Sequence, residues 1–141
     1  MTGSSEANTG RAARVASRAT ADIIGVGGSL RRLTRSFVGP FAVRTVQGHF
    51  ADRLFLSVKG LTDTGMMTDA DALEAEVKRT MIAQAGESTL LVDRSKMLVR
   101  GLSVIASVAE VSNVIAHGLT AEEVTALRAA RGSLRVLDEE N

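Results

Sequence analysis

The chain has 141 residues, 45% of them hydrophobic and 23% charged, a composition that fits one globular domain rather than a disordered protein. It contains no cysteine, and its two histidines, His49 and His117, stand far apart, so we expect no disulfide, no thiolate chemistry and no metal site. No apolar run approaches the roughly 20 residues of a membrane span, and the N-terminus lacks the apolar core of a signal peptide, so we expect a cytoplasmic protein.

The net charge is +1, but positive charge is concentrated at the front, where residues 1–50 carry seven arginines and two acids. Such a distribution is compatible with nucleic-acid binding. However, the chain has no Trp, no Tyr and only four Phe, too few aromatic rings to stack single-stranded bases. No helix-turn-helix pattern precedes the first predicted strand. We therefore expect no direct DNA contact by this chain.

Residues 1–21 are small, polar and basic, which predicts a flexible basic arm. The apolar run at residues 22–26 predicts the first strand, which ends at Gly27 and Gly28. Paired glycines after a strand form a tight turn or let the backbone approach an anion closely. The tight turn is the simpler interpretation.

Pro40 predicts the first turn of a helix that ends near Gly48. Its predicted apolar stripe consists of Phe41, Thr45 and Val46. Residues 53–58 predict the second strand, which closes at Lys59-Gly60. Residues 61–67, which include a glycine, are predicted to form the loop from this strand to the next helix. The loop is long for its kind, and long loops of this type commonly carry function.

The strongest helical pattern of the chain follows residue 68. Thr68 and Asp71 resemble a capping box and predict the helix N-terminus. Apolar positions that recur every four residues predict the buried side: Leu73, Val77 and Met81. Glu74 and Lys78 are spaced for an i,i+4 pair on a solvated face. Gly86 occupies the position expected just past the C-terminus of this helix.

A short apolar run, Leu90-Leu91-Val92, leads directly into polar residues with no Gly or Pro between them. Such a run is typical of a strand that is covered on both faces. Because ligands bind beyond the carboxyl ends of strands in open α/β sheets, Asp93, Ser95 and Lys96 are predicted to lie at the rim of a binding crevice. The plainer alternative is that Asp93 and Ser95 are ordinary turn residues and Lys96 a solvated lysine.

Strands and helices alternate in the last third of the chain. Strands are predicted at residues 102–106, 113–116 and 134–137, and a helical turn at 108–111. Thr120 and Glu123 form a full capping box for a last helix that ends at Gly132. This alternation predicts an α/β fold with a layered, largely parallel sheet and flanking helices.

Several short motifs occur in an order that is more specific than any one of them. They are Gly27-Gly28-Ser29-Leu30-Arg31, Ser36-Phe37-Val38-Gly39-Pro40, Asp52 with Phe55-Leu56, Gly60-Leu61, Glu74-Ala75-Glu76-Val77-Lys78 and Asp93-Arg94-Ser95-Lys96. With these motifs the chain, from about Ile23 to its end, resembles the effector-sensing C-terminal domain of the DeoR family of bacterial sugar-catabolism repressors. The resemblance implies a fold similar to that of ribose-5-phosphate isomerase, with a phosphorylated sugar bound at the strand ends.

The resemblance also implies a set of ligand-binding residues: Asp93, Ser95, Lys96, Lys59, Gly60, Gly27, Gly28 and Lys78. By this analogy Lys96 places its ammonium group near the phosphate or a sugar oxygen. Asp93 accepts hydrogen bonds from sugar hydroxyls or orients Lys96. No cofactor, metal or catalytic residue is implied, because we find no acid, outside helix caps and solvated faces, for the proton transfer that the related isomerases perform.

The chain departs from the family pattern in three ways. It lacks the N-terminal winged helix-turn-helix that binds operator DNA. It also lacks an Asp-x-Gly-Thr-Thr-type phosphate loop, which typical sensors carry upstream of the position of Met1. Lys59 stands where a small or acidic residue is expected, and Ala116-His117 where Thr-Asp is usual. We therefore expect an N-terminally truncated sensor domain at residues 22–141, without its first strand and helix.

The leading hypothesis is a sugar-phosphate-sensing module that acts by binding and homo-oligomerisation and not as an enzyme. Two alternatives stay open. A small phosphosugar isomerase would interconvert an aldose and a ketose phosphate. A degenerate sensor would no longer bind sugar and would only pair with intact repressors through its exposed surface.

Overall fold

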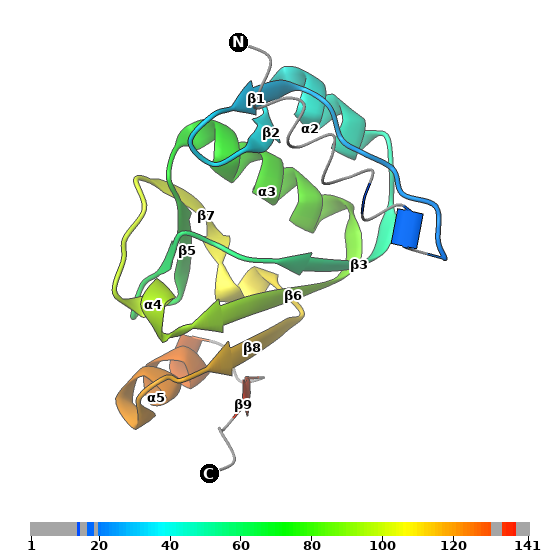
Figure 1. The fold of residues 1–141 in the computed structure, drawn as a ribbon. Coiled ribbons are helices and arrows are strands. Elements are labelled where there is room, and N and C mark those ends of the chain that lie inside the picture. The colour runs from blue at the N-terminus through cyan, green and yellow to red at the C-terminus, as the bar shows by residue number, and fades with distance from the viewer. Residues whose placement is uncertain (1–13, 15–16, 19, 131–133, 138–141) are drawn as a thin grey trace.

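The computed structural model describes residues 14, 17–18, 20–130 and 134–137 of the chain (Figure 1). Within these residues the main sheet contains four parallel strands in the order β3-β6-β8-β9. Their bounds are Ala51–Leu56 (β3), Ala85–Asp93 (β6), Asn113–His117 (β8) and Arg135–Leu137 (β9). This sheet, with its flanking helices, confirms the predicted α/β fold class.

A second sheet is antiparallel, with the order β4-β5-β7. Its strands are Gly60–Leu61 (β4), Met66–Asp69 (β5) and Ser103–Ser107 (β7). The segment 61–67, predicted as a loop from strand to helix, therefore lies mostly in the β4–β5 hairpin, and the strand predicted at 102–106 joins this second sheet. A separate short hairpin pairs β1 (Ser29–Arg31) with β2 (Ser36–Val38).

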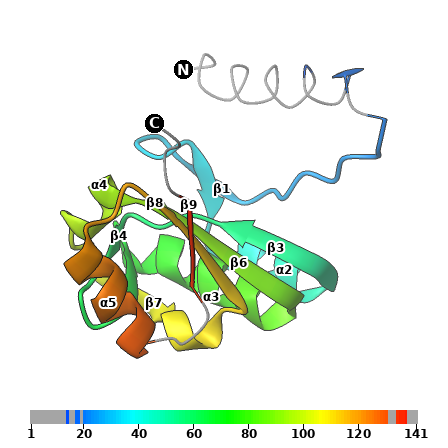
Figure 2. The same ribbon diagram turned by 90° about the horizontal axis from the view of Figure 1, so that it is seen from below.

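The helices lie around the main sheet in a defined arrangement. They are α2 (Pro40–Gln47), α3 (Ala72–Gln84), α4 (Arg94–Met97) and α5 (Ala121–Ala130), with a 3-10 turn at Val108–Glu110. Figure 2 shows α3, α5 and β7 on the same side of the main sheet. Helix α2 and the β1–β2 hairpin pack against α3 (Figure 1). None of the helices in the described ranges has the length and apolarity to cross a bilayer.

Most of the hydrophobic core lies between the main sheet and α3, α5 and the second sheet. Leu56, Leu90 and Val114 are buried on three neighbouring strands. They join a cluster that includes Leu61, Met67, Ala75, Ile105, Val108 and Leu127. Burial of each large apolar side chain contributes about 1.5–3 kcal/mol. Phe55 and Leu91, which alternate with these inward residues, are 64% and 42% exposed, so the opposite face of the sheet is accessible.

Residues 22–26 do not form the predicted strand. This segment is extended but unpaired, and Ile23 and Ile24 are 47% and 76% exposed. An extended segment becomes a strand only when a neighbour shares its backbone hydrogen bonds. None of the described strands pairs with it. Val26 packs instead against a second buried cluster formed by Val38, Ala42, Val43 and Val77.

Helix α2 begins at Pro40, as predicted, but the residues predicted for its buried apolar stripe are wrong. Ala42 and Val43 are its buried residues, while Phe41 is 70% exposed. The helix packs against α3 through the face that carries these two residues, which join the buried cluster that includes Val77 of α3. The physical partner of the helix, which the local pattern does not specify, therefore decides which face is buried.

The N-termini of α3 and α5 contrast in how well the sequence predicts them. Helix α3 is capped by Asp71, whose carboxylate accepts a hydrogen bond from the Glu74 N–H at 2.9 Å, whereas Thr68 is buried in β5. In α5 the predicted capping box is confirmed. The Thr120 hydroxyl accepts from the Glu123 N–H at 3.2 Å, and the Glu123 carboxylate accepts from the Thr120 N–H at 2.8 Å.

Three other boundary predictions have different outcomes. Helix α3 ends at Gln84 with Ala85 as its C-cap, so Gly86 lies just past the helix end, as predicted, and is already part of β6. Gly132, the predicted end of the last helix, lies outside the described residues, as does most of the predicted arm at residues 1–21.

Candidate functional site

The candidate site lies where the parallel strands of the main sheet end. Asp93 and His117 are the last residues of β6 and β8, and the register places them opposite each other. A pocket of about 390 Å³ lies at this edge. Its lining residues are Ser57, Leu91, Val92, Asp93, Lys96, Ile115, His117 and Leu137. We call this cavity the strand-end pocket.

Asp93 links the end of β6 to the short helix α4. Its Oδ1 accepts hydrogen bonds from the Ser95 backbone N–H at 2.8 Å and from the Ser95 hydroxyl. The Ser95 hydroxyl and then the Ser95 N–H hold the pKa of Asp93 below its usual range, with smaller contributions from the charges of Lys96 and His117. Asp93 is therefore anionic at neutral pH. Because both bonds use Oδ1, Oδ2 is able to accept a hydrogen bond from a ligand hydroxyl.

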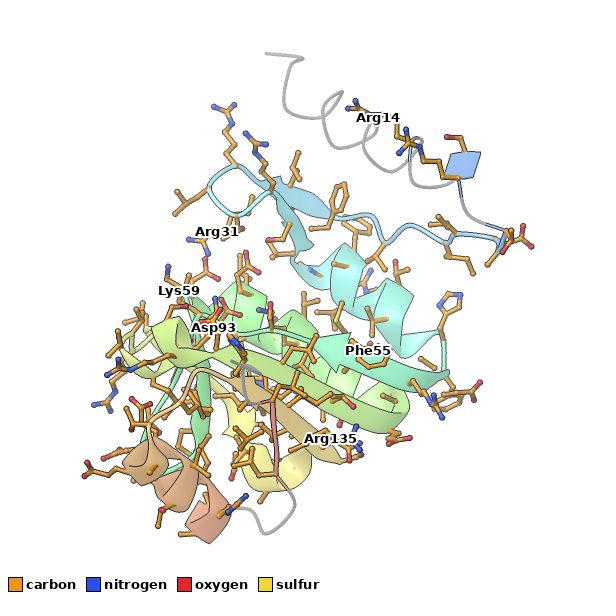
Figure 3. All side chains as sticks on the ribbon, turned by 60° about the horizontal axis from the view of Figure 1, so that its bottom comes forward. Arg14, Arg31, Phe55, Lys59, Asp93 and Arg135 are labelled. Atoms are coloured by element: carbon orange, nitrogen blue, oxygen red, sulfur yellow. The ribbon has the colours of Figure 1, made fainter. Side chains whose placement is uncertain are left out.

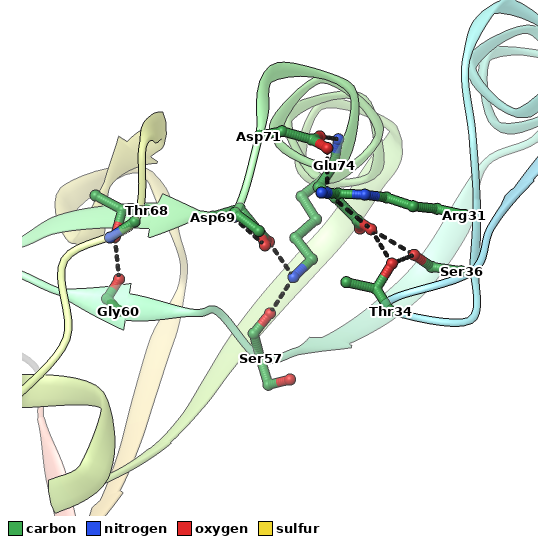
Figure 4. Close-up of polar contacts among 12 residues, drawn as sticks. Arg31, Thr34, Ser36, Ser57, Gly60, Thr68, Asp69, Asp71 and Glu74 are labelled. Carbon is green, nitrogen blue, oxygen red and sulfur yellow. Dashed lines mark hydrogen bonds and ion pairs between the residues drawn. The ribbon is translucent and has the colours of Figure 1, made fainter.

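Lys96 lines the strand-end pocket from α4, and the chain that follows α4 is fastened to the second sheet. The Thr68 hydroxyl donates to the Gly60 carbonyl at 3.0 Å and accepts from the Gly101 N–H at 2.9 Å (Figure 4). A Cβ atom on Gly60 would lie 1.8 Å from the Val99 carbonyl oxygen, so only glycine allows this approach. Gly60 is buried and supports the loop that follows α4. It is absent from the residues that line the strand-end pocket.

The other two lysines predicted for the site lie elsewhere. The ammonium group of Lys78 donates to the Ser57 carbonyl at 2.8 Å and forms an ion pair with Asp69 (Figure 4). Lys78 therefore fixes the backbone of Ser57, just after β3, and is absent from the residues that line the pocket. The Lys59 side chain is exposed and also lies outside the pocket lining, although its backbone N–H donates to the Thr68 carbonyl at 3.0 Å. Figure 3 shows Lys59 and Asp93 in this region of the molecule.

Gly27 and Gly28 do not line the strand-end pocket. Gly28 has a φ of +138°, and a Cβ there would lie 2.9 Å from the Val38 carbonyl oxygen and 3.0 Å from the Ala42 Cβ. Glycine is thus required at position 28 for the entry into the β1–β2 hairpin, next to the start of α2. A Cβ on Gly27 would meet no atom within 4 Å.

Helix α3 carries a polar cluster that fastens the β1–β2 hairpin. The Glu74 carboxylate accepts hydrogen bonds from the hydroxyls of Thr34 and Ser36, both at 2.5 Å (Figure 4). Arg31 forms an ion pair with Asp71 and approaches Glu74 at 3.8 Å. Glu74 is 6% exposed, so the prediction of a solvated face with a Glu74–Lys78 pair is wrong. Its partners come from a hairpin about 40 residues earlier, which helical spacing does not reveal.

The structure therefore brings together Asp93, Ser95 and Lys96 of the predicted set, and adds Ser57 and His117. A signal for the added residues was present in the sequence. Each stands at or just beyond the end of a strand, and the carboxyl ends of parallel strands meet at one edge of a sheet. Ser57 follows Leu54-Phe55-Leu56 and His117 follows Val114-Ile115-Ala116, apolar runs as long as the one before Asp93.

Comparison with known proteins gives a consistent result. The family model described as the DeoR C-terminal sensor domain matches residues 7–117. The chain is 36% identical over 106 residues to an uncharacterised helix-turn-helix-type transcriptional regulator, YulB, of Bacillus subtilis; the match covers 74% of this chain and 41% of that protein.

Two further relatives are also regulators, and the name of one of them refers to the L-fucose operon. The chain is 29% identical over 93 residues to the L-fucose operon activator of Escherichia coli, covering 66% of this chain and 38% of the activator. It is 34% identical over 92 residues to the transcriptional regulator GlpR of Haloferax volcanii, covering 65% of this chain and 36% of GlpR. The chain thus spans about two-fifths of the length of these relatives.

Proposed function

Because the chain belongs to the DeoR C-terminal sensor domain family, we propose that it is an effector-sensing module that binds a phosphorylated sugar in the strand-end pocket. One observation carries the proposal: an ammonium group and a carboxylate, those of Lys96 and Asp93, line the same pocket at the ends of parallel strands. A phosphorylated sugar needs a cation for its phosphoryl group and acceptors for its hydroxyl groups, and this pocket offers both.

Each side chain has a distinct task in this proposal. Lys96 is a point charge with three N–H donors, which suits a phosphoryl group that presents oxygens in several directions. Asp93 is held as an anion by Ser95 and accepts from sugar hydroxyls through Oδ2. The apolar side chains of Leu91 and Ile115 contact the carbon skeleton of the sugar. Binding orders the start of α4, because Asp93 belongs to both the pocket and the helix cap.

The module acts by binding rather than by catalysis, in line with the regulators that it resembles. On this proposal DNA is contacted through the helix-turn-helix part that the relatives' names indicate, and the sensor module transmits the effector signal through contacts between copies. Light scattering of the purified chain, with and without effector, tests the homo-oligomer. A single monomeric mass under both conditions would contradict that part of the proposal.

A thermal-shift screen tests the binding itself. The purified chain is heated with phosphorylated sugars, each next to its unphosphorylated form. We expect at least one phosphosugar to raise the melting temperature, and Lys96→Ala to abolish this rise. Arg128→Ala, which removes an exposed cation on α5, serves as the matched control and should retain the rise. A cooperative unfolding transition that no phosphosugar shifts at millimolar concentration contradicts the proposal. Interconversion of an aldose phosphate and a ketose phosphate by the purified chain would show that it is an enzyme and contradict the sensor function.

A further inference from the structure

His117 lies in the strand-end pocket next to the residues already discussed. It is the last residue of β8, and the register sets it opposite Asp93 on one side and Leu137 on the other. It lines the pocket together with Lys96. Of the described residues that line this pocket, Lys96 and His117 are the two with basic side chains.

In the described part of the chain, three elements near His117 carry charged groups. β6 contributes Asp93, whose electrostatic interaction with His117 helps to keep the carboxyl group ionised. Helix α4 contributes Lys96 and Arg94, and a Cβ on Gly118, which follows His117, would lie 4.0 Å from the Arg94 Cβ. α5 contributes Glu123, which approaches Arg94 at 3.9 Å. The other strand beside His117 is β9, which places the apolar Leu137 at the pocket.

The two acids in this set already have partners. Asp93 caps α4 through Ser95. Glu123 accepts from the Thr120 N–H at 2.8 Å in the capping box of α5. A dianion that enters the pocket meets the basic side chains of Lys96 and His117 and the carboxylate of Asp93, which already caps α4.

We propose that protonated His117 is a second cationic anchor for the phosphoryl group, opposite Lys96, so that effector binding takes up a proton. The proposal rests on the proposed function for the location of the ligand. Histidine changes charge between about pH 5 and 8, and an imidazolium donates two N–H groups where a neutral imidazole donates one. By linkage, a ligand that binds the protonated form more tightly raises the pH at which His117 titrates.

The sign of the pH dependence follows directly. As the pH falls through the imidazole titration, His117 gains a positive charge and the affinity for a dianion rises. A hydrogen bond to a charged group is strong enough to tighten binding about tenfold or more. Sulfate keeps its double negative charge across this pH range, unlike phosphate, so sulfate isolates the titration of the protein.

The test is an NMR titration of the two histidines of the full chain between pH 5 and 8.5. It is run in sodium sulfate and in sodium chloride at equal ionic strength. His49→Gln assigns the signals. We expect sulfate to raise the His117 midpoint by about one unit at saturation, which corresponds to tenfold tighter binding by the protonated form. His49, which is bonded to the Thr45 carbonyl at the end of α2, should not respond.

Two controls separate site binding from general effects. Lys96→Ala should reduce the sulfate effect on His117, because the anion loses its other anchor. Asp138, Glu139 and Glu140 follow Leu137 in the sequence and lie outside the described residues, so the titration is repeated with all three changed to amides. The sulfate effect should persist there. An equal effect on His49 and His117, or no effect on either, would overturn the proposal.

A second measurement keeps this inference distinct from the proposed function. A phosphosugar that raises the melting temperature is measured with the wild type and with His117→Gln at pH 6 and pH 8. The phosphosugar itself loses negative charge between pH 8 and pH 6, so the wild type and the variant are compared at each pH. We expect the ratio of the wild-type affinity to the His117→Gln affinity to be about tenfold larger at pH 6 than at pH 8. Binding that depends on Lys96, with an affinity ratio of wild type to His117→Gln that is the same at both pH values, contradicts only the role of His117. Absence of any phosphosugar binding contradicts the proposed function as well.

Discussion

Gly60 and Val99 are in such close contact that a Cβ on Gly60 would lie 1.8 Å from the Val99 carbonyl oxygen. Their contact fastens the loop after α4 to β4, and Lys96 depends on the position of α4. We expect Gly60→Ala to lower the free energy of unfolding by about 1–3 kcal/mol or more, because backbone atoms on both sides must move apart. Urea denaturation measures this loss.

The matched control is Gly27→Ala. A Cβ on Gly27 meets no atom within 4 Å, and Gly27 has no positive φ. We expect a change within about 0.5 kcal/mol. Equal losses for the two variants would show that the contact between Gly60 and Val99 is not the cause.

Glu74 and Glu76 lie two residues apart on α3 and should differ sharply in their importance. Glu74 is 6% exposed and accepts hydrogen bonds from Thr34 and Ser36, whereas Glu76 is exposed. Glu74→Ala leaves the hydroxyls of Thr34 and Ser36 without their carboxylate acceptor, so we expect a loss of about 1–3 kcal/mol. Glu76→Ala should stay within about 0.5 kcal/mol. Denaturant unfolding of both variants is sufficient, and a neutral Glu74→Ala would contradict the structure of the cluster.

Local patterns in the sequence predicted those parts of the fold that depend on near neighbours. The apolar run before Asp93 predicted β6, and the capping box at Thr120 and Glu123 predicted α5. The same run placed Asp93, Ser95 and Lys96 at a strand end, where a pocket is found. In each case the physical cause lies within a few residues of its effect.

The features that the sequence did not predict depend on distant partners. Glu74 is buried against Thr34 and Ser36, whose hydroxyls donate to its carboxylate and which lie 40 and 38 residues earlier in the chain. The Lys78 ammonium group is absent from the pocket lining because it donates to the Ser57 carbonyl and forms an ion pair with Asp69. Helical spacing specifies which residues share a face, but it does not specify what that face contacts.

Val77 and Leu73 show this limit in a form that can be measured. Both were predicted to be buried on α3, yet Val77 is 6% exposed and Leu73 is 45% exposed. Val77→Asp places an unpaired charge in the cluster under α2, and we expect the domain to lose its cooperative unfolding transition. Leu73→Asp should retain a cooperative transition. Circular dichroism during heating distinguishes these outcomes, and similar curves for the two variants would contradict the observed orientation of α3.

The pKa of Asp93 provides a test of the cap of α4. The Ser95 hydroxyl and N–H lower this pKa in the folded state, so the cap contributes stability above the unfolded value of about 3.9. That contribution is lost as the pH falls through the lower, folded pKa. We expect Ser95→Ala to raise the Asp93 titration midpoint, followed by carboxyl-carbon NMR, and Ser95→Thr to leave it low. A midpoint that is the same in all three proteins would show that Ser95 does not hold the carboxylate.

Lys96 and Lys78 were both predicted to bind the ligand, and the structure gives them different positions. Lys96 lines the strand-end pocket, whereas Lys78 forms an ion pair with Asp69 and holds the Ser57 carbonyl. We expect Lys96→Met to weaken phosphosugar binding by about 1.5–3 kcal/mol, the value of a charged hydrogen bond, with little change in the melting temperature. Lys78→Met should instead lower the melting temperature, because Asp69 loses its partner while only 4% exposed. Calorimetric titration and thermal unfolding of both variants measure the two effects separately. If Lys78→Met were as stable as the wild type and lost binding, Lys78 would be a ligand contact and the pocket would extend beneath the end of β3.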